Sequence, residues 1–440
     1  MIGTSKVTGT PSSDARQRPD CNGTPFSVGA AALVTCKSSR IGKIYKQISC
    51  YAGFSDVMQI DHVHFYVENA SSSRNWFVRQ LGFQAVAAKV SSHTCTEVVK
   101  SGPVYFVLSS PLTERGPVAE FLRQHPPGVA DIAFLVEDVE AVMSRAIAHG
   151  AKVLQPIQQH PQDKGCLKWG KIAAWGSLTH TLIQQSVSAQ ISFPWLHILL
   201  YSDLSASIDI EQLVKVATVD TSSLYNDLAR VPDGISNTFT GIDHVVLNVA
   251  AGELEGAVAW YKNALEFQSK QTFKIQTDRS ALYSQVMVSG NGCVQFPINE
   301  PASPNSQIQE FLNVNRGSGI QHIALQTVNI VQAIAQFRFC GVPFLPVPPS
   351  YYTALQHRQG LPLSAAELEA LAFQQILVDW EKTTPHALLL QTFTQPIFDQ
   401  PTFFFEIIER RSQARGFGEG NFRALFEAIE AEQLKRGSLL

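Results

Sequence analysis

The clearest pattern along the chain is a set of apolar strands, each interrupted by one polar side chain. Residues 401–408 read Pro-Thr-Phe-Phe-Phe-Glu-Ile-Ile, which predicts a strand buried on both faces. Two further apolar segments, 241–246 and 319–325, carry His244 and His322 in the same kind of setting. Burial of such groups is costly unless they meet a cation, a metal ion or hydrogen-bond partners. The three segments therefore indicate a polar site inside an apolar sheet.

Self-similarity divides the chain into repeated units. Residues 61–67 and 243–249 share a strand pattern that is followed by an aromatic-rich helix. Residues 128–134 and 319–325 form a second matching pair, and each leads through a helix to a glycine at the same distance. We therefore predict an α+β protein built from four βαβββ modules in two similar halves. Each half is expected to be a curved, open, barrel-like sheet with helices outside.

Domain limits follow from changes in composition. Residues 1–57 are rich in Ser, Thr and Gly and show no hydrophobic periodicity, so we expect an extension without chemistry. Met58 is favoured as the natural start. A transit or disordered segment is the alternative, and a secretory signal is disfavoured because the apolar stretch is short. The first module pair is expected at 58–203, a polar, turn-rich linker at 204–240, and the second pair at 241–440.

Overall composition excludes several classes of partner. The net charge of −3 gives no reason to expect nucleic acid or an anionic membrane surface. No segment reaches the roughly 18 apolar residues that a membrane span requires. The seven cysteines are scattered without a C-x-x-C pair, which is typical of free thiols in a reducing compartment. We therefore expect a cytoplasmic protein that binds neither nucleic acid nor a membrane.

The polar residues of the three apolar strands form a recognisable ligand set. Two imidazoles and one carboxylate are the facial triad of non-haem Fe(II) sites, which leaves positions open for substrate and oxygen. His244 and His322 each lie on the first strand of a module, and Glu406 lies on the last strand of the last module. Internal symmetry would bring these strands together. The sequence therefore predicts a centre with one Fe(II) per subunit, although Mn, Co or Zn accept the same ligands.

The first half is not expected to hold a second metal ion. Where the second half has His322, the first half has Asp131. The apolar segment 193–197, interpreted as the last strand of the first half, offers no acid that matches Glu406. The first half is therefore predicted to be a duplicated module pair without a metal site.

Uncharged polar residues surround the proposed centre in otherwise apolar strands: Ser284, Asn299, Gln307, Gln321 and Gln391. Buried amides need partners. They either bond to one another or line a polar pocket in an aromatic wall, which would suit a substrate with a phenol and an acidic head. A glycine-rich turn at 416–421 then opens an amphipathic helix. This helix is either an ordinary terminal helix or a lid that excludes water.

Four segments carry a family resemblance: 296–301, 319–324, 401–408 and 416–422. Together they closely resemble the 4-hydroxyphenylpyruvate dioxygenase family, which has the vicinal oxygen chelate fold, and the resemblance runs from about residue 58 to the C-terminus. It implies that His244, His322 and Glu406 are iron ligands. It further implies that substrate contacts come from Ser284, Asn299, Gln307, Gln321, Gln391, Phe393, Phe404 and Phe422, with Asn421 at the lid.

The resemblance also implies a reaction and an assembly. The substrates would be 4-hydroxyphenylpyruvate and O2, the products homogentisate and CO2, and the protein a homo-oligomer, either a dimer or a tetramer. Gln395 and Gln400 depart from the basic residues expected there, which affects surface charge rather than the site.

Three alternatives stay open at this point. A 4-hydroxymandelate synthase would use the same iron site and substrate but hydroxylate the benzylic carbon. A non-catalytic small-molecule-binding protein of the same fold would be expected to lack a ligand. A glyoxalase-type isomerase or lyase would normally have a fourth protein ligand.

Overall fold

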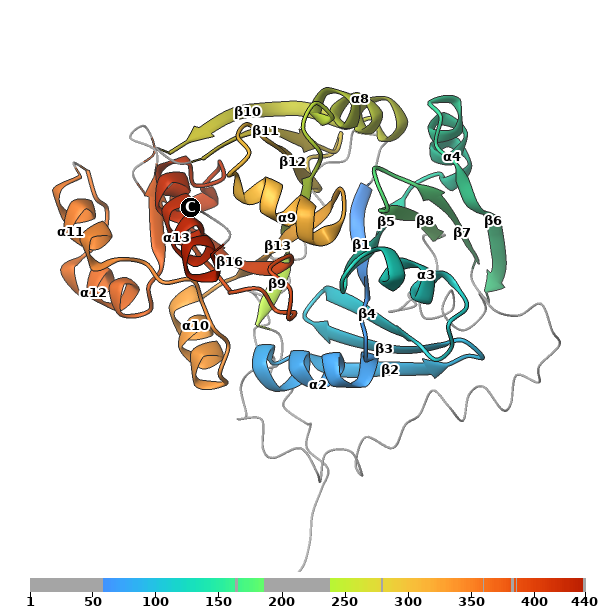
Figure 1. The fold of residues 1–440 in the computed structure, drawn as a ribbon, viewed down its shortest axis with the longest axis horizontal. Helices are drawn as coiled ribbons and strands as arrows, with labels where there is room; N and C mark the ends of the chain where they lie inside the picture. The colour runs from blue at the N-terminus through green and yellow to red at the C-terminus, as the bar shows by residue number, and fades with distance from the viewer. Residues whose placement is uncertain are drawn as a thin grey trace, which may run out of the picture. The chain divides into compact units, whose positions relative to one another are not determined.

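The computed structural model describes residues 58–162, 165–185, 238–277, 280–358, 360–380, 384 and 386–437, all within one compact unit, Phe54–Leu440. The expected extension at 1–57 and all but the last three residues of the expected linker at 204–240 lie outside the described residues. The two halves predicted from the repeat are both present (Figure 1).

The first half contains β1 (Met58–Tyr66), α2 (Ala70–Leu81), β2 (Gln84–Val90), β3 (Thr94–Ser101), β4 (Val104–Pro111), α3 (Pro117–Gln124), β5 (Gly128–Val136), α4 (Val139–Ala148), β6 (Val153–Gln162), β7 (Gly165–Ala173) and β8 (Thr179–Gln185). Its described strands form one sheet in the order β2-β3-β4-β1-β5-β8-β7-β6. Two βαβββ modules therefore meet at the β1–β5 pair.

The second half contains β9 (Phe239–Asn248), α8 (Leu254–Leu265), β10 (Gln268–Gln276), β11 (Ala281–Val288), β12 (Gln295–Pro301), α9 (Gln307–Asn315), β13 (Gly319–Thr327), α10 (Ile330–Phe339), α11 (Pro349–His357), α12 (Ala365–Phe373), β14 (Leu377–Trp380), β15 (Leu388–Phe393), β16 (Phe404–Arg410), the 3-10 turn η1 (Arg411–Gln413) and α13 (Glu419–Arg436). Its sheet order, β10-β11-β12-β9-β13-β16-β15-β14, repeats that of the first half. The predicted fold class is confirmed.

Side chains that cap helices explain where the outer helices begin. Asn69, Asp138 and Asn329 each accept a hydrogen bond from a backbone N–H three residues further on, at the starts of α2, α4 and α10. In Figure 1, α2 covers one sheet and α8 the other, while α4 and α8 lie next to each other. None of the described helices combines the length and the apolar character needed to cross a membrane.

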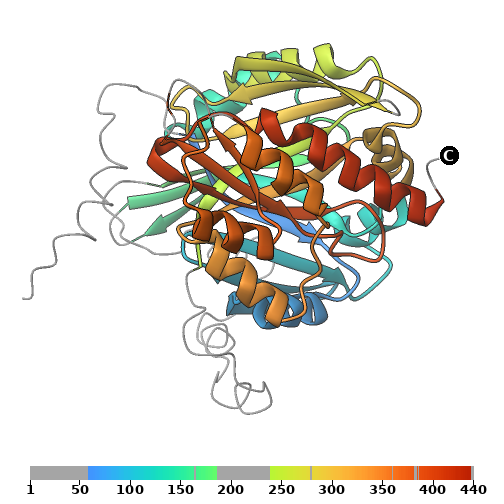
Figure 2. The ribbon, with the colours of Figure 1, turned by 90° about the vertical axis from the view of Figure 1, so that its left-hand side faces the viewer.

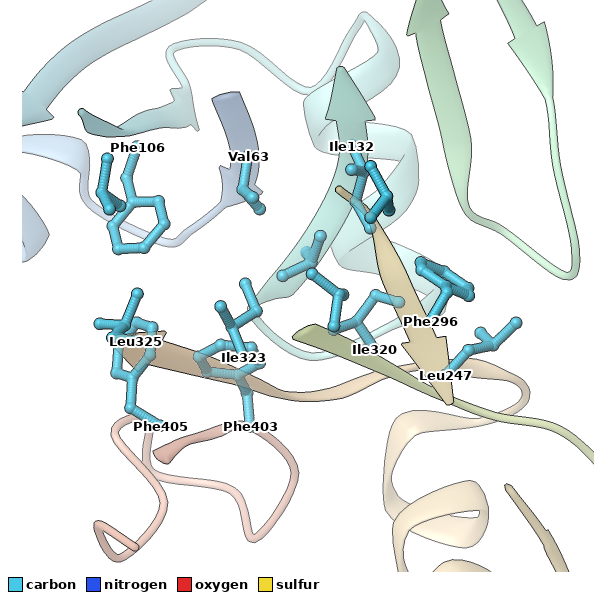
Figure 3. Packing of buried hydrophobic residues seen from close by; sticks show 14 of the residues in the cluster. Val63, Phe106, Ile132, Leu247, Phe296, Ile320, Ile323, Leu325, Phe403 and Phe405 are labelled. Carbon is cyan, nitrogen blue, oxygen red and sulfur yellow. The ribbon is translucent and has the colours of Figure 1, made fainter. Parts of the chain in front are cut away.

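The two halves share one hydrophobic core. Phe403 and Phe405 of the second half pack against Phe65 and Phe106 of the first, with ring centroids 5.1 and 5.7 Å apart. Figure 3 shows Phe403 and Phe405 gathered with Phe106 and Val63 in this cluster. Burial of one such side chain contributes about 1.5–3 kcal/mol. The first half therefore supports the strand that carries Glu406.

The first half keeps the layout of the proposed metal centre without its ligands. The strand register places His62, Asp131 and Thr181 at the positions equivalent to the three proposed ligands. Lys171 Nζ lies 3.3 Å from Asp131 Oδ1, so an ammonium group neutralises this buried acid. Among the described residues, no group of three metal-binding side chains occurs in this half.

One sequence-based assignment in the first half is wrong. Residues 193–197, which lie outside the described residues, were expected to form the strand that matches β16. The place beside β5 is instead taken by β8. The apolar run Leu182–Ile183 within β8 is short. The segment 193–197 is more apolar, and it was therefore chosen as the strand in place of β8.

Candidate metal centre

Three adjacent strands bring the proposed ligands to one face of the second sheet. β9 pairs with β13 in antiparallel fashion and β16 pairs with β13 in parallel fashion, so that His244 and Glu406 both lie opposite Ala324. His322 precedes Ala324 by two residues on the same strand, and residues two apart on a strand share a face. The pairing register thus gathers two imidazoles and one carboxylate, as the repeat pattern predicts.

The distances among the three side chains fit a bound metal ion. His244 Nε2 lies 3.1 Å and His322 Nε2 lies 3.8 Å from Glu406 Oε2, and the three ligand atoms lie within 4.8 Å of one another. Ligands about 2.1 Å from a metal ion and at right angles to each other would be about 3 Å apart. All three side chains are buried. The donor set and its spacing suit a divalent transition metal with open coordination positions.

Hydrogen bonds fix the tautomer of both imidazoles. His244 Nδ1 donates to Asp243 Oδ1 at 2.9 Å, and His322 Nδ1 donates to Gln321 Oε1 at 3.1 Å. An ionised carboxylate and an amide oxygen only accept hydrogen bonds, so each Nδ1 carries the proton. Nε2 of each imidazole is therefore the atom that faces Glu406 and is available for metal ligation.

The protonation of the two imidazoles differs in the metal-free protein. Burial lowers the pKa of His244, but the carboxylates of Glu406 and Asp243 outweigh burial and raise this pKa to about 9. Burial and the neighbouring His244 hold the pKa of His322 well below its usual value. His322 is thus neutral, whereas His244 carries a second proton, on the Nε2 atom that faces Glu406. A metal ion binding here would displace that proton.

Eleven of the twelve residues proposed from the sequence line one cavity: His244, Ser284, Asn299, Gln307, Gln321, His322, Gln391, Phe393, Phe404, Glu406 and Phe422. The cavity lies between the sheet of the second half and α13, which crosses that half in Figure 2. The remaining wall is apolar: Val246, Phe273, Ile275, Leu282, Val286, Pro297, Ile308, Phe417, Phe426 and Ile429. Phe426 and Ile429 belong to the helix that the sequence suggests as a lid.

Asn421, the twelfth proposed residue, is not part of the cavity wall. It is buried, and its Oδ1 accepts a hydrogen bond of 2.8 Å from the hydroxyl of Tyr351. The same hydroxyl oxygen accepts a hydrogen bond of 2.8 Å from the backbone N–H of Val378. The side chain of Asn421 therefore fastens the start of α13 to the neighbouring strand and helix.

Aromatic rings pack directly on both imidazoles. Phe404 stacks on His322 with centroids 4.8 Å apart and planes at 17°. Phe417 meets His244 edge to face at 5.3 Å. Such contacts restrict the rotation of the rings and keep water from one side of the ligands. The sequence does not predict this role for Phe417, because the glycine-rich residues around it indicate only a turn.

The amides inside the cavity are incompletely paired. Asn299 Nδ2 donates to Asn248 Oδ1 at 3.3 Å. The Oε1 atoms of Gln307 and Gln391 are buried and have no hydrogen-bond partner among the described residues. Unpaired buried acceptors are costly, so a hydroxyl group of a bound molecule would be stabilised by them. The interpretation of these amides as pocket residues agrees with this arrangement.

Comparison with known proteins identifies the family. The profile of the Glyoxalase/Bleomycin resistance protein/Dioxygenase superfamily matches residues 59–166 and 241–357, one segment in each half. The chain is 36% identical over 405 residues to the 4-hydroxyphenylpyruvate dioxygenase of Coccidioides posadasii, covering 86% of this chain and 94% of the relative. The chain belongs to the 4-hydroxyphenylpyruvate dioxygenase family.

Other members and a solved structure agree with this assignment. The 4-hydroxyphenylpyruvate dioxygenase of Caenorhabditis briggsae is 35% identical over 399 residues, covering 87% of this chain and 94% of the relative. A mutant of 4-hydroxymandelate synthase from Streptomyces coelicolor has a TM-score of 0.68 at 25% identity, covering 85% of this chain and 98% of that one. The family predicted from four sequence motifs is confirmed.

Gly418 shows how tightly the cavity wall of this family member is built. It has φ of 79° at the start of α13, and a Cβ atom there would overlap the amide of Gln391. We expect Gly418→Ala to lower kcat/KM by about tenfold, because it strains the backbone and displaces Gln391. Steady-state oxygen uptake would measure the loss.

Gly437→Ala is the matched control for Gly418→Ala. Gly437 ends the same helix with φ of 74°, but a Cβ atom there meets nothing within 4 Å. Equal losses of kcat/KM in the two variants would show that backbone strain alone is responsible, and that Gln391 is not involved.

Proposed function

We propose that the protein is a 4-hydroxyphenylpyruvate dioxygenase that converts 4-hydroxyphenylpyruvate and O2 to homogentisate and CO2. Its cofactor is one Fe(II) per subunit, held by His244, His322 and Glu406. Family membership over 86% of the chain supports the activity. The observation that carries the proposal is the two-histidine, one-carboxylate group in the wall of a cavity rich in aromatic side chains.

The ligand set leaves room for chemistry at the metal. Three protein ligands on one face leave the remaining positions of an octahedral ion for other molecules. Bound Fe(II) supplies dioxygen activation and a template for the 2-oxo acid group of the substrate. The substrate carries its own 2-oxo acid, so no separate co-substrate is needed.

The side chains of the cavity orient the substrate and limit its contact with water. Phe393, Phe404 and Phe422 form an apolar wall that holds the aromatic ring of the substrate. One of the two unpaired acceptors, Gln307 Oε1 or Gln391 Oε1, accepts a hydrogen bond from the phenol hydroxyl, while Ser284 and Asn299 provide further polar contacts. The apolar wall limits the access of water, which reduces the loss of oxidising equivalents to side reactions.

Product analysis after a controlled turnover tests the proposal. The full chain is loaded with Fe(II) without air, 4-hydroxyphenylpyruvate and oxygenated buffer are added, and oxygen uptake is compared with product formation. We expect one homogentisate and one CO2 for each O2 consumed. Hydroxymandelate as product would identify a 4-hydroxymandelate synthase with the same ligands. Bound iron without oxygen uptake would contradict any 4-hydroxyphenylpyruvate oxygenase.

Two further properties stay predictions. Self-association as a dimer or tetramer rests on family resemblance, and size-exclusion chromatography with light scattering measures it. A cytoplasmic location rests on the cysteine pattern and the low charge, and fractionation of cells measures it.

A further inference from the structure

Arg410 connects two parts of the protein that meet at the cavity. Its Nε donates to Asp243 Oδ2 at 2.6 Å and its Nη2 donates to Asp243 Oδ1 at 2.8 Å. Its Nη1 donates to the carbonyl oxygens of Ala414 at 3.1 Å and Gly416 at 2.9 Å. Side chains of Arg410 and Asp243 are 12% and 5% exposed, so these are largely desolvated, charge-assisted contacts.

The first branch of these contacts leads to a proposed metal ligand. Asp243 Oδ1 also accepts the Nδ1 proton of His244. A carboxylate in this place sets the ring orientation and raises the donor strength of the imidazole. Arg410 clamps both oxygens of that carboxylate, so it fixes the direction of Asp243 and hence that of His244.

The second branch leads to the wall of the cavity. Ala414 and Gly416 belong to the segment 411–418, which joins β16 to α13. This segment carries Phe417, whose ring meets His244. The guanidinium group of Arg410 therefore orients the imidazole of His244 through Asp243. It also binds the backbone of the segment that packs against this imidazole.

The internal repeat provides a comparison within the same chain. The first half keeps the paired acid, because His62 Nδ1 lies 2.7 Å from Asp61 Oδ2. Counting from Thr181, the position equivalent to Arg410 is Gln185 on β8. The arginine therefore occurs in the half with the ligand triad, and an uncharged amide occurs in the half without it. Folding of the module does not by itself require an arginine at this position.

We propose that Arg410 is a positioning residue that couples the order of segment 411–418 to the binding of the metal ion by His244. Loss of the arginine would loosen the segment and weaken metal binding together. The inference rests on His244 being a metal ligand, as the proposed function states.

Two substitutions separate the contributions of charge and geometry. Arg410→Gln introduces the residue type found at the equivalent position of the first half, Gln185. It removes the contacts with Asp243 and those with the segment 411–418. We expect the dissociation constant of Fe(II), measured anaerobically against a chelator, to rise about 10–100-fold. We also expect faster amide hydrogen exchange in residues 411–418. Arg410→Lys keeps a cation beside Asp243 but cannot donate in both directions, so metal affinity and protection from exchange should both be restored only in part.

Arg411→Gln is the matched control. Arg411 neighbours Arg410 but pairs with Glu409 and Glu367 instead, so the charge change is the same and neither branch is touched. Wild-type metal affinity is expected for this variant. Unchanged affinity in Arg410→Gln, or an equal loss in Arg411→Gln, would overturn the inference. Weaker binding in Arg410→Gln with unaltered exchange would also overturn it, since no coupling would exist.

The failure of the proposed function is distinguishable from the failure of this inference. A wild-type protein that does not bind Fe(II) would refute the ligand assignment itself. A wild-type protein that binds Fe(II) no better than Arg410→Gln would refute only the role of Arg410.

Discussion

Glu406→Ala is expected to abolish iron retention and turnover while the fold stays intact. Glu406 is the only anionic side chain of the triad, and two neutral imidazoles hold a divalent ion weakly. The loss should exceed the roughly 10–100-fold typical of residues that only orient a ligand. Iron content after gel filtration, oxygen uptake and circular dichroism together measure these effects.

Glu409→Gln serves as the control on the same strand. Glu409 lies three residues further along β16, on the other face of the sheet. It accepts hydrogen bonds from the backbone N–H of Ile330 and from Arg411, and it does not belong to the cavity wall. Its variant should retain iron. Wild-type iron content and activity in Glu406→Ala would show that the ligand assignment is incorrect.

Lys171→Met is expected to reduce the free energy of unfolding by about 3 kcal/mol, because it removes the cation beside a buried acid. Asp131 is 1% exposed. One of its oxygens accepts a hydrogen bond from Thr179 at 2.5 Å, and the other has no hydrogen-bond partner in the part of the chain that the structure describes. Urea denaturation followed by fluorescence measures the change. Turnover of the folded fraction should be unaffected, since this pair lies in the half without a metal centre.

Lys168→Met tests whether burial causes the effect of Lys171→Met. Lys168 lies on the same strand, β7, and pairs with Glu140 at the surface, where an ion pair contributes about 1 kcal/mol or less. The double variant Asp131→Leu, Lys171→Met should regain much of the lost stability, because an apolar pair needs no compensating charge. Similar losses from Lys171→Met and Lys168→Met would contradict this explanation.

The sequence predicted those parts of the structure that depend on repeated patterns. His244, His322 and Glu406 stand out because each interrupts an apolar strand, and the duplication places their strands side by side. The same duplication predicts the four modules. Such patterns can be recognised in the sequence because a side chain on a strand can point to only one of the two faces of the sheet.

Other features depend on long-range packing and were not predictable. Asn421 is hydrogen-bonded to Tyr351 of α11 instead of lining the cavity. The importance of Arg410 depends on Asp243, which is 167 residues away in sequence. Phe417 contacts His244 only because of the path that the glycine-rich turn takes. None of these contacts leaves a periodic signal in the sequence.

The two-sided character of β16 has a consequence for folding. Phe403 and Phe405 face the core between the halves, whereas Phe404 and Glu406 face the cavity. A slip of one residue along this strand would place Glu406 in the core and a phenyl ring at the metal centre. A bound ion therefore stabilises only the chain that is paired in the correct register, by about 2.7 kcal/mol at a concentration a hundred times its dissociation constant. The protein without metal would still fold, but its midpoint of thermal unfolding should rise as the concentration of the metal ion rises.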